Sequence, residues 1–298
     1  MKYRKLFLEV MQPDAVFLTL AGSSVGTGVA HYLGESIFWG HSLLGCAAML
    51  FMVWAKNLLK EYFDHPDSSF SILKSSHPRF SSLIGVKRPP LLTYGLLALT
   101  ASTFLVSLIA INRGSAPSLL LITALFAALL LLTILPPFFF QRKGFGELLE
   151  GIALTGLTPF LALLLNNGTP HPILVMYSLP ALLLVLAGKL AFSLQTYLED
   201  KTGGNPNLLN RLDWARSMKL HNYLLIFSYL LIALFSFIGL SWNLTWPMLV
   251  TFPIALAEFL QIQSMLNGGR PNWRLLELSA GGLIGLVYYL QVITLWTH

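Results

Sequence analysis

The chain has 298 residues, of which 55% are hydrophobic and 11% are charged, and its mean hydropathy is +0.68. Soluble domains carry about 25% charged residues, so this composition excludes an ordinary soluble protein. The formal net charge of +6 is explained by Lys and Arg residues in the loops between the apolar segments. It therefore does not indicate a nucleic-acid partner. The one cysteine, Cys46, excludes an internal disulfide and any Cys-based metal site.

Apolar segments recur along the whole chain, and each is long enough to cross a hydrocarbon core of roughly 30 Å as a helix of about 20 residues. We draw the spans at 15–33, 37–59, 91–112, 117–137, 147–166, 172–194, 221–241, 244–266 and 275–296. The sequence therefore predicts an all-α membrane protein with about nine transmembrane helices. No linker divides the chain, so we expect a single domain over residues 1–298. Glu9, Pro13 and Asp14 interrupt the apolar core of a cleavable signal, so we expect the N-terminal segment to be retained.

Lys and Arg are distributed unequally between the two sides of these spans. With the N-terminus inside, Arg113 lies outside, and sixteen of the 19 basic residues lie inside: Lys2, Arg4, Lys5, Lys60, Lys74, Arg79, Lys87, Arg88, Arg142, Lys143, Lys201, Arg211, Arg216, Lys219, Arg270 and Arg274. Cytoplasmic loops carry an excess of Lys and Arg. The sequence therefore predicts a multi-pass integral membrane protein, in the cell membrane if bacterial, with a cytoplasmic N-terminus and an external C-terminus.

The first span contains AGSSVGTG at residues 21–28. Small residues allow the backbones of membrane helices to approach closely. We expect this segment to pack tightly against another helix.

The second span runs into WAKNLLKEYFDHPDSSF, residues 54–70, which contains three of the 13 acidic residues. Helical spacing places Asn57, Glu61, Asp64 and Ser68 on one face, with Lys56 and Lys60 beside it. Lys56 either extends its ammonium group to the membrane interface or faces the interior of the bundle.

The loops that follow carry cations beside these carboxylates. Lys87 and Arg88 precede the third span, and Glu147 and Glu150 lie where the fifth span begins. Glu147 suits the positive end of a helix. Glu150 is either a cavity residue or a residue of the first helical turn. The seven histidines show no metal-ligand spacing, and we expect them at the membrane interface.

A second polar face occurs in AGKLAFSLQTYLEDKTGG, residues 187–204. Lys189, Ser193, Thr196 and Asp200 recur at helical spacing, with Glu199 beside them. Each acidic cluster follows an even-numbered span, so both lie on the predicted cytoplasmic side. We therefore expect the two faces to meet across one central cavity that opens to the cytoplasm, with Arg88 and Lys189 near its mouth.

Carboxylates at helical spacing on two facing helices suit Mg²⁺, which prefers oxygen ligands and usually shares them with substrate phosphates. At a membrane surface this pattern favours a lipid diphosphate as ligand. Metal and basic residues would stabilise departing pyrophosphate, while an apolar bundle holds the lipid tail and excludes water.

The sequence resembles the UbiA-type intramembrane prenyltransferases over nearly its whole length. NLLKEYFDHPDSS is similar to the first Asp-rich motif of that family, as written in its dihydroxynaphthoate branch. RKGFGELLEGIALTG resembles that branch's Gly-x-Gly-Glu segment, and EVMQPDAVFLTLAG its opening helix. DKTGGNPNLLNRL matches the stretch around the end of the second motif. The resemblance implies a nine-helix fold and Mg²⁺-dependent prenyl transfer.

The motifs depart from the family pattern at several positions. Lys60 stands in place of Asn, Glu61 in place of the first Asp, and Thr196 in place of an Asp. Ser68 stands where the last Asp is usual, with Asp67 one residue earlier, and Asn205 replaces a Lys. The resemblance therefore implies one bound Mg²⁺ ion rather than two.

The two polar faces, the basic residues beside them and the resemblance together assign candidate roles. We assign catalysis to Asp64, Asp200 and Glu61; metal binding to Glu61, Asp64, Asp67, Glu199 and Asp200; and substrate binding to Asn57, Lys60, Arg88, Lys189, Thr196 and Lys201.

Our leading hypothesis is a transferase of quinone biosynthesis that moves a polyprenyl chain from its diphosphate to a quinone precursor or another lipophilic cyclic acceptor. The alternative is a catalytically impaired protein that binds an isoprenoid or quinone, or that serves as a subunit of a membrane complex. A transporter would place ionisable residues near the bilayer midplane, whereas here they cluster at one side.

Overall fold

The computed structural model describes residues 11–64, 88–113, 117–141, 143–166, 169–202 and 208–298. The described residues form helices and no strand. The elements are α2 (Pro13–Tyr32), α3 (Trp39–Asp64), α4 (Arg88–Arg113), α5 (Pro117–Ile134), α6 (Gly146–Gly151), the π-helix η2 (Ile152–Leu157), α7 (Thr158–Leu164), α8 (Pro172–Thr202), α9 (Leu208–Leu212), α10 (Trp214–Ile238), α11 (Trp242–Leu249), α12 (Phe252–Leu266) and α13 (Trp273–Thr297).

Eight segments among the described residues are long and apolar enough to cross a membrane. They are Trp39–Phe63, Leu91–Asn112, Pro117–Ile134, Gly146–Leu164, Pro172–Tyr197, Trp214–Ile238, Trp242–Leu266 and Trp273–Thr297. α2, with 20 residues, runs beside them as a ninth helix and is less apolar because it contains several Gly, Ser and Thr residues. The predicted all-α membrane fold with about nine spans is confirmed, and the chain is a multi-pass integral membrane protein.

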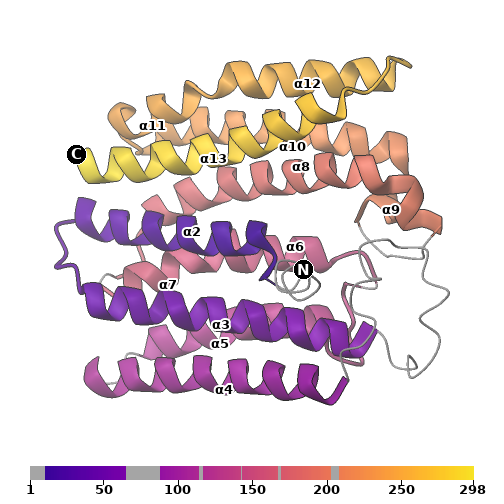
Figure 1. The fold of residues 1–298 in the computed structure, drawn as a ribbon. Coiled ribbons are helices and arrows are strands. Elements are labelled where there is room, and N and C mark those ends of the chain that lie inside the picture. The colour runs from indigo at the N-terminus through magenta and orange to yellow at the C-terminus, as the bar shows by residue number, and fades with distance from the viewer. Residues whose placement is uncertain (1–10, 65–87, 114–116, 142, 167–168, 203–207) are drawn as a thin grey trace.

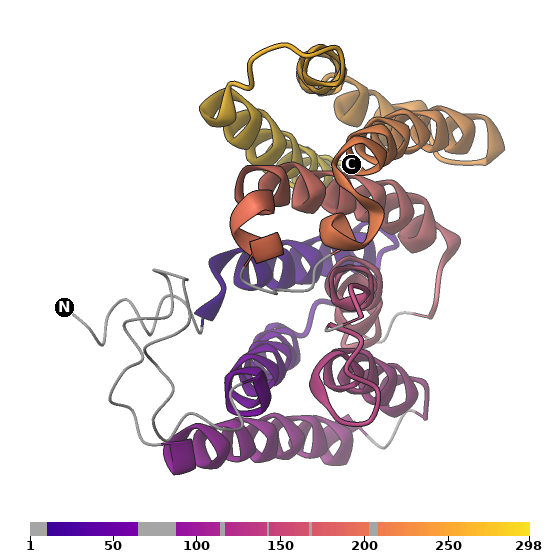
Figure 2. The ribbon, with the colours of Figure 1, turned by 90° about the vertical axis from the view of Figure 1, so that its right-hand side faces the viewer.

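The long helices run side by side, and successive helices run in opposite directions (Figure 1). α3 and α8 both finish at the end where α2 begins, and the C-terminus lies at the opposite end. Viewed from that first end, α2 lies between α3 and α8 (Figure 2). The topology therefore brings both predicted polar faces to one end of the molecule.

α2 packs closely against α7 through its small residues. A Cβ atom at Gly26 would lie 2.7 Å from Ala162 Cβ and would collide with the Pro159 carbonyl oxygen, and one at Gly22 would lie 3.1 Å from the Leu154 carbonyl oxygen. The approach at Gly26 is open only to glycine, and the approach at Gly22 is tight. The predicted close packing of the AGSSVGTG segment is therefore confirmed.

The fifth span crosses the bundle as three joined pieces, α6, η2 and α7. The π-helical turn starts two residues after Glu150 and buries Thr155 completely. π-Helical turns in α-helices are rare and frequently accompany functional sites. This π-helical turn therefore follows Glu150 closely in the chain.

Candidate functional site

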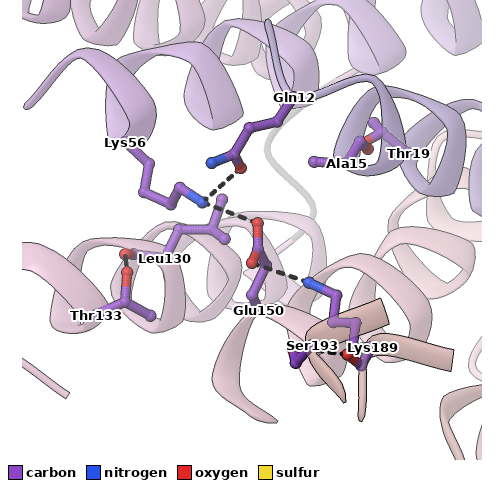
Figure 3. A network of polar contacts seen from close by, with 9 residues as sticks. All are labelled: Gln12, Ala15, Thr19, Lys56, Leu130, Thr133, Glu150, Lys189 and Ser193. Carbon is purple, nitrogen blue, oxygen red and sulfur yellow. Dashed lines mark hydrogen bonds and ion pairs between the residues drawn. The ribbon is translucent and has the colours of Figure 1, made fainter. Parts of the chain in front are cut away.

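Three charged side chains from three helices meet inside the bundle. Lys56 Nζ on α3 lies 2.8 Å from Glu150 Oε1 on α6, and Lys189 Nζ on α8 lies 3.0 Å from Glu150 Oε2 (Figure 3). Lys56 Nζ also donates to Gln12 Oε1, at 3.3 Å, just before α2. We call Lys56, Glu150 and Lys189 the ion triad.

The ion triad is largely withdrawn from solvent. The exposed fractions of its side chains are 3% for Lys56, 13% for Glu150 and 15% for Lys189. An ionised group at this depth is strongly disfavoured unless an opposite charge and hydrogen bonds compensate it. One carboxylate therefore bridges two ammonium groups and ties α3, α6 and α8 together.

A polar cavity of about 90 Å³ lies against the ion triad. Its lining includes Lys56 and Glu150, and the remaining residues come from α5, the α5–α6 connection and the start of α6: Thr133, Gln141, Gly144, Gly146 and Glu147. The cavity is roughly large enough for three water molecules. It offers ammonium, carboxylate, amide and hydroxyl groups to a small polar ligand.

The structure resolves two alternatives that the sequence leaves open. Lys56 faces the interior of the bundle, and Glu150 lines the cavity. Lys189 is paired with Glu150, as the cost of an unpaired Lys at this depth requires. Its predicted place near the mouth of a cavity stays a prediction. The cost of an unpaired Lys is also the sequence signal from which the ion triad could have been inferred.

The first motif face occupies the last two turns of α3. Asn57 is buried, with an exposed fraction of 2%, and Lys60 and Glu61 are half-buried. Asp64 is the last residue of α3, and its side chain lies outside the described part of the structure. Asp67, which we expect to bind metal, also lies outside the described residues.

The second motif face occupies the C-terminal part of α8. Thr196 Oγ1 donates to the Ser193 carbonyl oxygen of its own helix, at 3.4 Å. The backbones of Glu199, Asp200 and Lys201 belong to α8, and Arg88 is the first residue of α4. Their side chains lie outside the described part of the structure, so the roles assigned to these four residues stay predictions.

The described residues include no group of three or more His, Cys, Asp or Glu side chains arranged to hold a metal ion. Glu150, one of the two carboxylates that line the cavity, is already engaged by two ammonium groups. A metal at this end of the bundle would therefore depend on Glu61 and on the carboxylates at the ends of α3 and α8.

At the end of the bundle where α8 finishes, α9 contacts the α5–α6 connection. Arg211 donates to the Lys143 carbonyl oxygen at 2.9 Å, and its guanidinium lies 4.2 Å from the centre of the Phe145 ring. A guanidinium over an aromatic face is attracted by the ring electrons. This contact links α9 to the loop that carries part of the cavity lining.

A second buried polar group lies between α10 and α12. His221 Nε2 lies 2.8 Å from Glu258 Oε1, and the two side chains are 0% and 1% exposed. His221 Nδ1 lies 3.1 Å from Asn222 Oδ1. His221 is therefore buried within the protein, and its predicted position at the membrane interface stays a prediction. The sequence signal was Glu258, an acidic residue within an otherwise apolar span.

No family model matches this sequence, and no curated protein sequence matches it. Solved structures do match in fold. A UbiA homologue from Archaeoglobus fulgidus, bound to GPP and Mg²⁺, is similar with a TM-score of 0.67 and 16% identity, over 100% of both chains. A structure of digeranylgeranylglyceryl phosphate synthase is similar with a TM-score of 0.67 and 16% identity, over 100% of this chain and 99% of the other.

A further structure of the Archaeoglobus fulgidus UbiA homologue, bound to DMAPP and Mg²⁺, has a TM-score of 0.62 and 15% identity, over 95% of this chain and 98% of the other. These likenesses extend over essentially the whole length of each chain, so they concern the complete helical bundle rather than one helical hairpin. The chain therefore has the fold of the UbiA homologues.

Proposed function

We propose that this protein is an intramembrane prenyltransferase, which moves a polyprenyl chain from its diphosphate to a lipophilic cyclic acceptor. The observation that carries the proposal is the meeting of the α3 and α8 C-terminal ends at one end of the bundle. Both ends carry Asp-rich segments that resemble the family motifs. The fold is that of UbiA homologues solved with GPP or DMAPP and Mg²⁺.

The donor set at these helix ends has the chemistry that Mg²⁺ requires. Glu61 and Asp64 on α3 and Glu199 and Asp200 on α8 are carboxylates, the ligands that Mg²⁺ usually shares with substrate phosphates; Asp67 follows α3 in the sequence. Mg²⁺ bound there would supply positive charge to a departing pyrophosphate.

The remaining polar residues of the two helix ends would bind and orient the diphosphate. Lys60 and Lys201 provide positive charge beside the carboxylates, and Arg88 provides it from the start of α4. Asn57 and Thr196 provide neutral hydrogen-bonding groups. Deeper in the bundle, the apolar helices would hold the lipid chain. They would also keep water from the allylic cation that remains when the diphosphate departs. The acceptor class follows from the resemblance to the dihydroxynaphthoate branch, which favours a quinone precursor.

We propose that both helix ends face the cytoplasm, with the C-terminus outside. The support is the excess of Lys and Arg in the connections at this end of the bundle. A soluble diphosphate made in the cytoplasm would then reach the site directly.

A second candidate is a non-catalytic protein that binds an isoprenoid or quinone, or that contributes a subunit to a membrane complex. Thr196 favours this second candidate. It stands where the family motif has a carboxylate, and its hydroxyl donates a hydrogen bond to its own helix. A hydroxyl is a weaker ligand for a divalent cation than a carboxylate.

Formation of a prenylated product separates the two candidates. Purified protein in lipid vesicles would be incubated with geranylgeranyl diphosphate, Mg²⁺ and a set of naphthoate, benzoate and chlorin acceptors. A prenylated product that disappears on chelation supports the proposal. Lipid binding without product from any acceptor would favour the second candidate.

A further inference from the structure

A groove of about 430 Å³ lies on the outer face of the bundle between α10 and α12. Its floor includes Ala255, and Phe252 and Phe259 lie three positions before and four positions after that residue on the same face of α12. The small side chain of Ala255 leaves the space between the two aromatic side chains open. Phe252 and Ile226, on the walls, are exposed, so the groove opens to the surroundings of the bundle.

The lining of the groove suits hydrocarbon. Leu225 and Tyr229 of α10 are buried in its floor. The Tyr229 hydroxyl is hydrogen-bonded to Thr251 Oγ1 at 2.6 Å, and its ring packs edge-on against the Phe252 ring, with 5.3 Å between the ring centres. Both helices belong to segments that are long and apolar enough to cross a membrane. An apolar chain of a lipid is the occupant that this environment supplies.

Polar residues continue the two groove faces toward the end of the bundle where α10 begins. Lys219 precedes Ile226 by seven residues, and Gln263 follows Leu256 by seven residues, so each lies on the same stripe of its helix as a groove residue. Both polar side chains are exposed. Because α10 and α12 run in opposite directions (Figure 1), Lys219 and Gln263 flank the same end of the groove.

A chain of hydrogen bonds orients the Gln263 amide. His221 lies between Glu258 Oε1, at 2.8 Å, and Asn222 Oδ1, at 3.1 Å. Asn222 Nδ2 then donates to Gln263 Oε1 at 3.4 Å. This contact uses the carbonyl oxygen of Gln263, whereas its NH₂ group, which has two donors, makes no hydrogen bond to the described residues. The exposed end of the chain therefore offers donors to an acceptor such as a phosphate oxygen.

The charge near this end of the groove favours an anion. Residues 213–219 and 267–277 contain four cations and two carboxylates: Arg216, Lys219, Arg270, Arg274, Asp213 and Glu277. Asp213 already accepts a hydrogen bond from the Tyr197 hydroxyl at 3.0 Å. Basic sites between transmembrane helices near the membrane surface bind anionic lipid head groups. The surplus of positive charge therefore selects a lipid with a negative head group.

The distance between the polar end and the far end of the groove matches one leaflet of a bilayer. Lys219 and Leu230 are eleven residues apart on α10, and Phe252 and Gln263 are eleven residues apart on α12. Eleven residues of helix span about 16 Å. Half of the hydrocarbon core is roughly 15 Å thick. A lipid with its head group at Lys219 and Gln263 would therefore reach the far end of the groove with its chain.

We propose that the groove between α10 and α12 binds an anionic phospholipid of the leaflet on the side where α10 begins. The phosphate accepts hydrogen bonds from the Lys219 ammonium group and the Gln263 NH₂ group, and one acyl chain lies along the groove over Ala255. α12 lies on the side of the bundle opposite α4 (Figure 1). The site is thus separate from the proposed prenyl-transfer site and does not rest on the proposed function.

The experiment measures lipid binding to the full-length purified protein by native mass spectrometry. Phosphatidylglycerol and phosphatidylcholine with the same acyl chains are titrated separately, and we expect tighter binding of phosphatidylglycerol. Lys219→Met should raise the dissociation constant for phosphatidylglycerol about fivefold, the effect of one basic residue near an anionic lipid, and leave that for phosphatidylcholine unchanged. Lys143→Met removes an exposed lysine of the α5–α6 connection, and as the matched control it should change neither.

Two further variants test the amide and the groove separately. Gln263→Glu keeps the side-chain size at an exposed position but replaces the donors by an anion, so phosphatidylglycerol alone should bind more weakly. Ala255→Leu fills the floor of the groove, so both lipids should bind at least about fivefold more weakly through lost contacts with the chain. Ala124→Leu, at an exposed position of α5, is its control. Melting temperatures in the same detergent show which variants fold, and Gln263→Glu gives an independent result if Ala255→Leu does not.

Equal affinity of the native protein for the two lipids overturns the anionic site. Unchanged phosphatidylglycerol binding by both Lys219→Met and Gln263→Glu does so as well, and unchanged binding by a folded Ala255→Leu variant removes the groove from the site. A native dimer that Ala255→Leu converts to a monomer would assign the groove to a second copy of the chain, which also contradicts the proposal.

Discussion

Glu150 accepts a hydrogen bond from Lys56 at 2.8 Å, although the two residues are 94 positions apart in the chain. The contact joins α6 to α3, and the same carboxylate reaches Lys189 on α8. Removing one partner of a buried ion pair leaves an uncompensated charge, whereas replacing all partners by apolar residues is often neutral. This asymmetry makes the energetic role of the ion triad testable.

We expect Glu150→Leu to lower the free energy of unfolding by about 3–5 kcal/mol, because it leaves two buried ammonium groups without an anion. The triple variant Lys56→Met, Glu150→Leu, Lys189→Met should recover most of that loss. Thermal unfolding in detergent measures both. A Glu150→Leu variant as stable as the native protein would show that the pairing contributes little to stability.

His221 and Glu258 should show a smaller effect of the same kind. Glu258→Leu removes the partner of a fully buried ring nitrogen, so we expect a loss of about 1–3 kcal/mol. Glu277→Leu, at an exposed position of α13, is the control and should change stability little. Equal melting temperatures for the two variants would contradict a structural role for the His221 contact.

The α2–α7 contact predicts a difference between two glycines. Gly26→Leu would drive its side chain into Pro159 and Ala162, so we expect separation of α2 from α7 and a loss of stability of at least about 1–3 kcal/mol, as for overpacked cores. Gly282→Ala on α13, which has open space around its Cβ position, should be tolerated. Melting temperatures in detergent test the pair, and an unaffected Gly26→Leu variant would contradict the close approach.

If prenyl transfer occurs, it should be slow and dependent on Mg²⁺. Asp64→Asn and Asp200→Asn should abolish it. Combining Lys60→Asn with Thr196→Asp should raise the rate, because a lost transition-state contact of this kind costs about a hundred- to a thousandfold. Single-turnover product formation from geranylgeranyl diphosphate measures the change. A double variant no faster than the native protein would contradict the prediction that Lys60 and Thr196 lower the rate of prenyl transfer.

The predicted orientation can be tested with single cysteines in a Cys46→Ser background. Ser36→Cys lies exposed in the α2–α3 connection, at the end of the bundle that carries the C-terminus (Figure 1). It should react with an impermeant maleimide in intact cells. Ser75→Cys, in the predicted cytoplasmic loop between α3 and α4, should react only after lysis. The opposite pattern would invert the topology.

The sequence determined the number of spans and where the polar helix ends gather. Each span is visible because crossing hydrocarbon requires about 20 apolar residues, and this requirement acts on every helix separately. The end of the bundle that receives α3 and α8 follows from counting crossings between them. The close packing of AGSSVGTG was likewise predictable, because small residues have a local meaning in membrane helices.

Only the tertiary structure decided which charged residues are partners. Helical spacing shows that Lys56 and Asn57 lie near the first motif and Lys189 near the second, but it does not fix how each helix is rotated about its own axis. Many apolar contacts set that rotation together. Lys56, Glu150 and Lys189 thus meet because three separately packed helices turn their polar positions toward one point, and His221 meets Glu258 for the same reason.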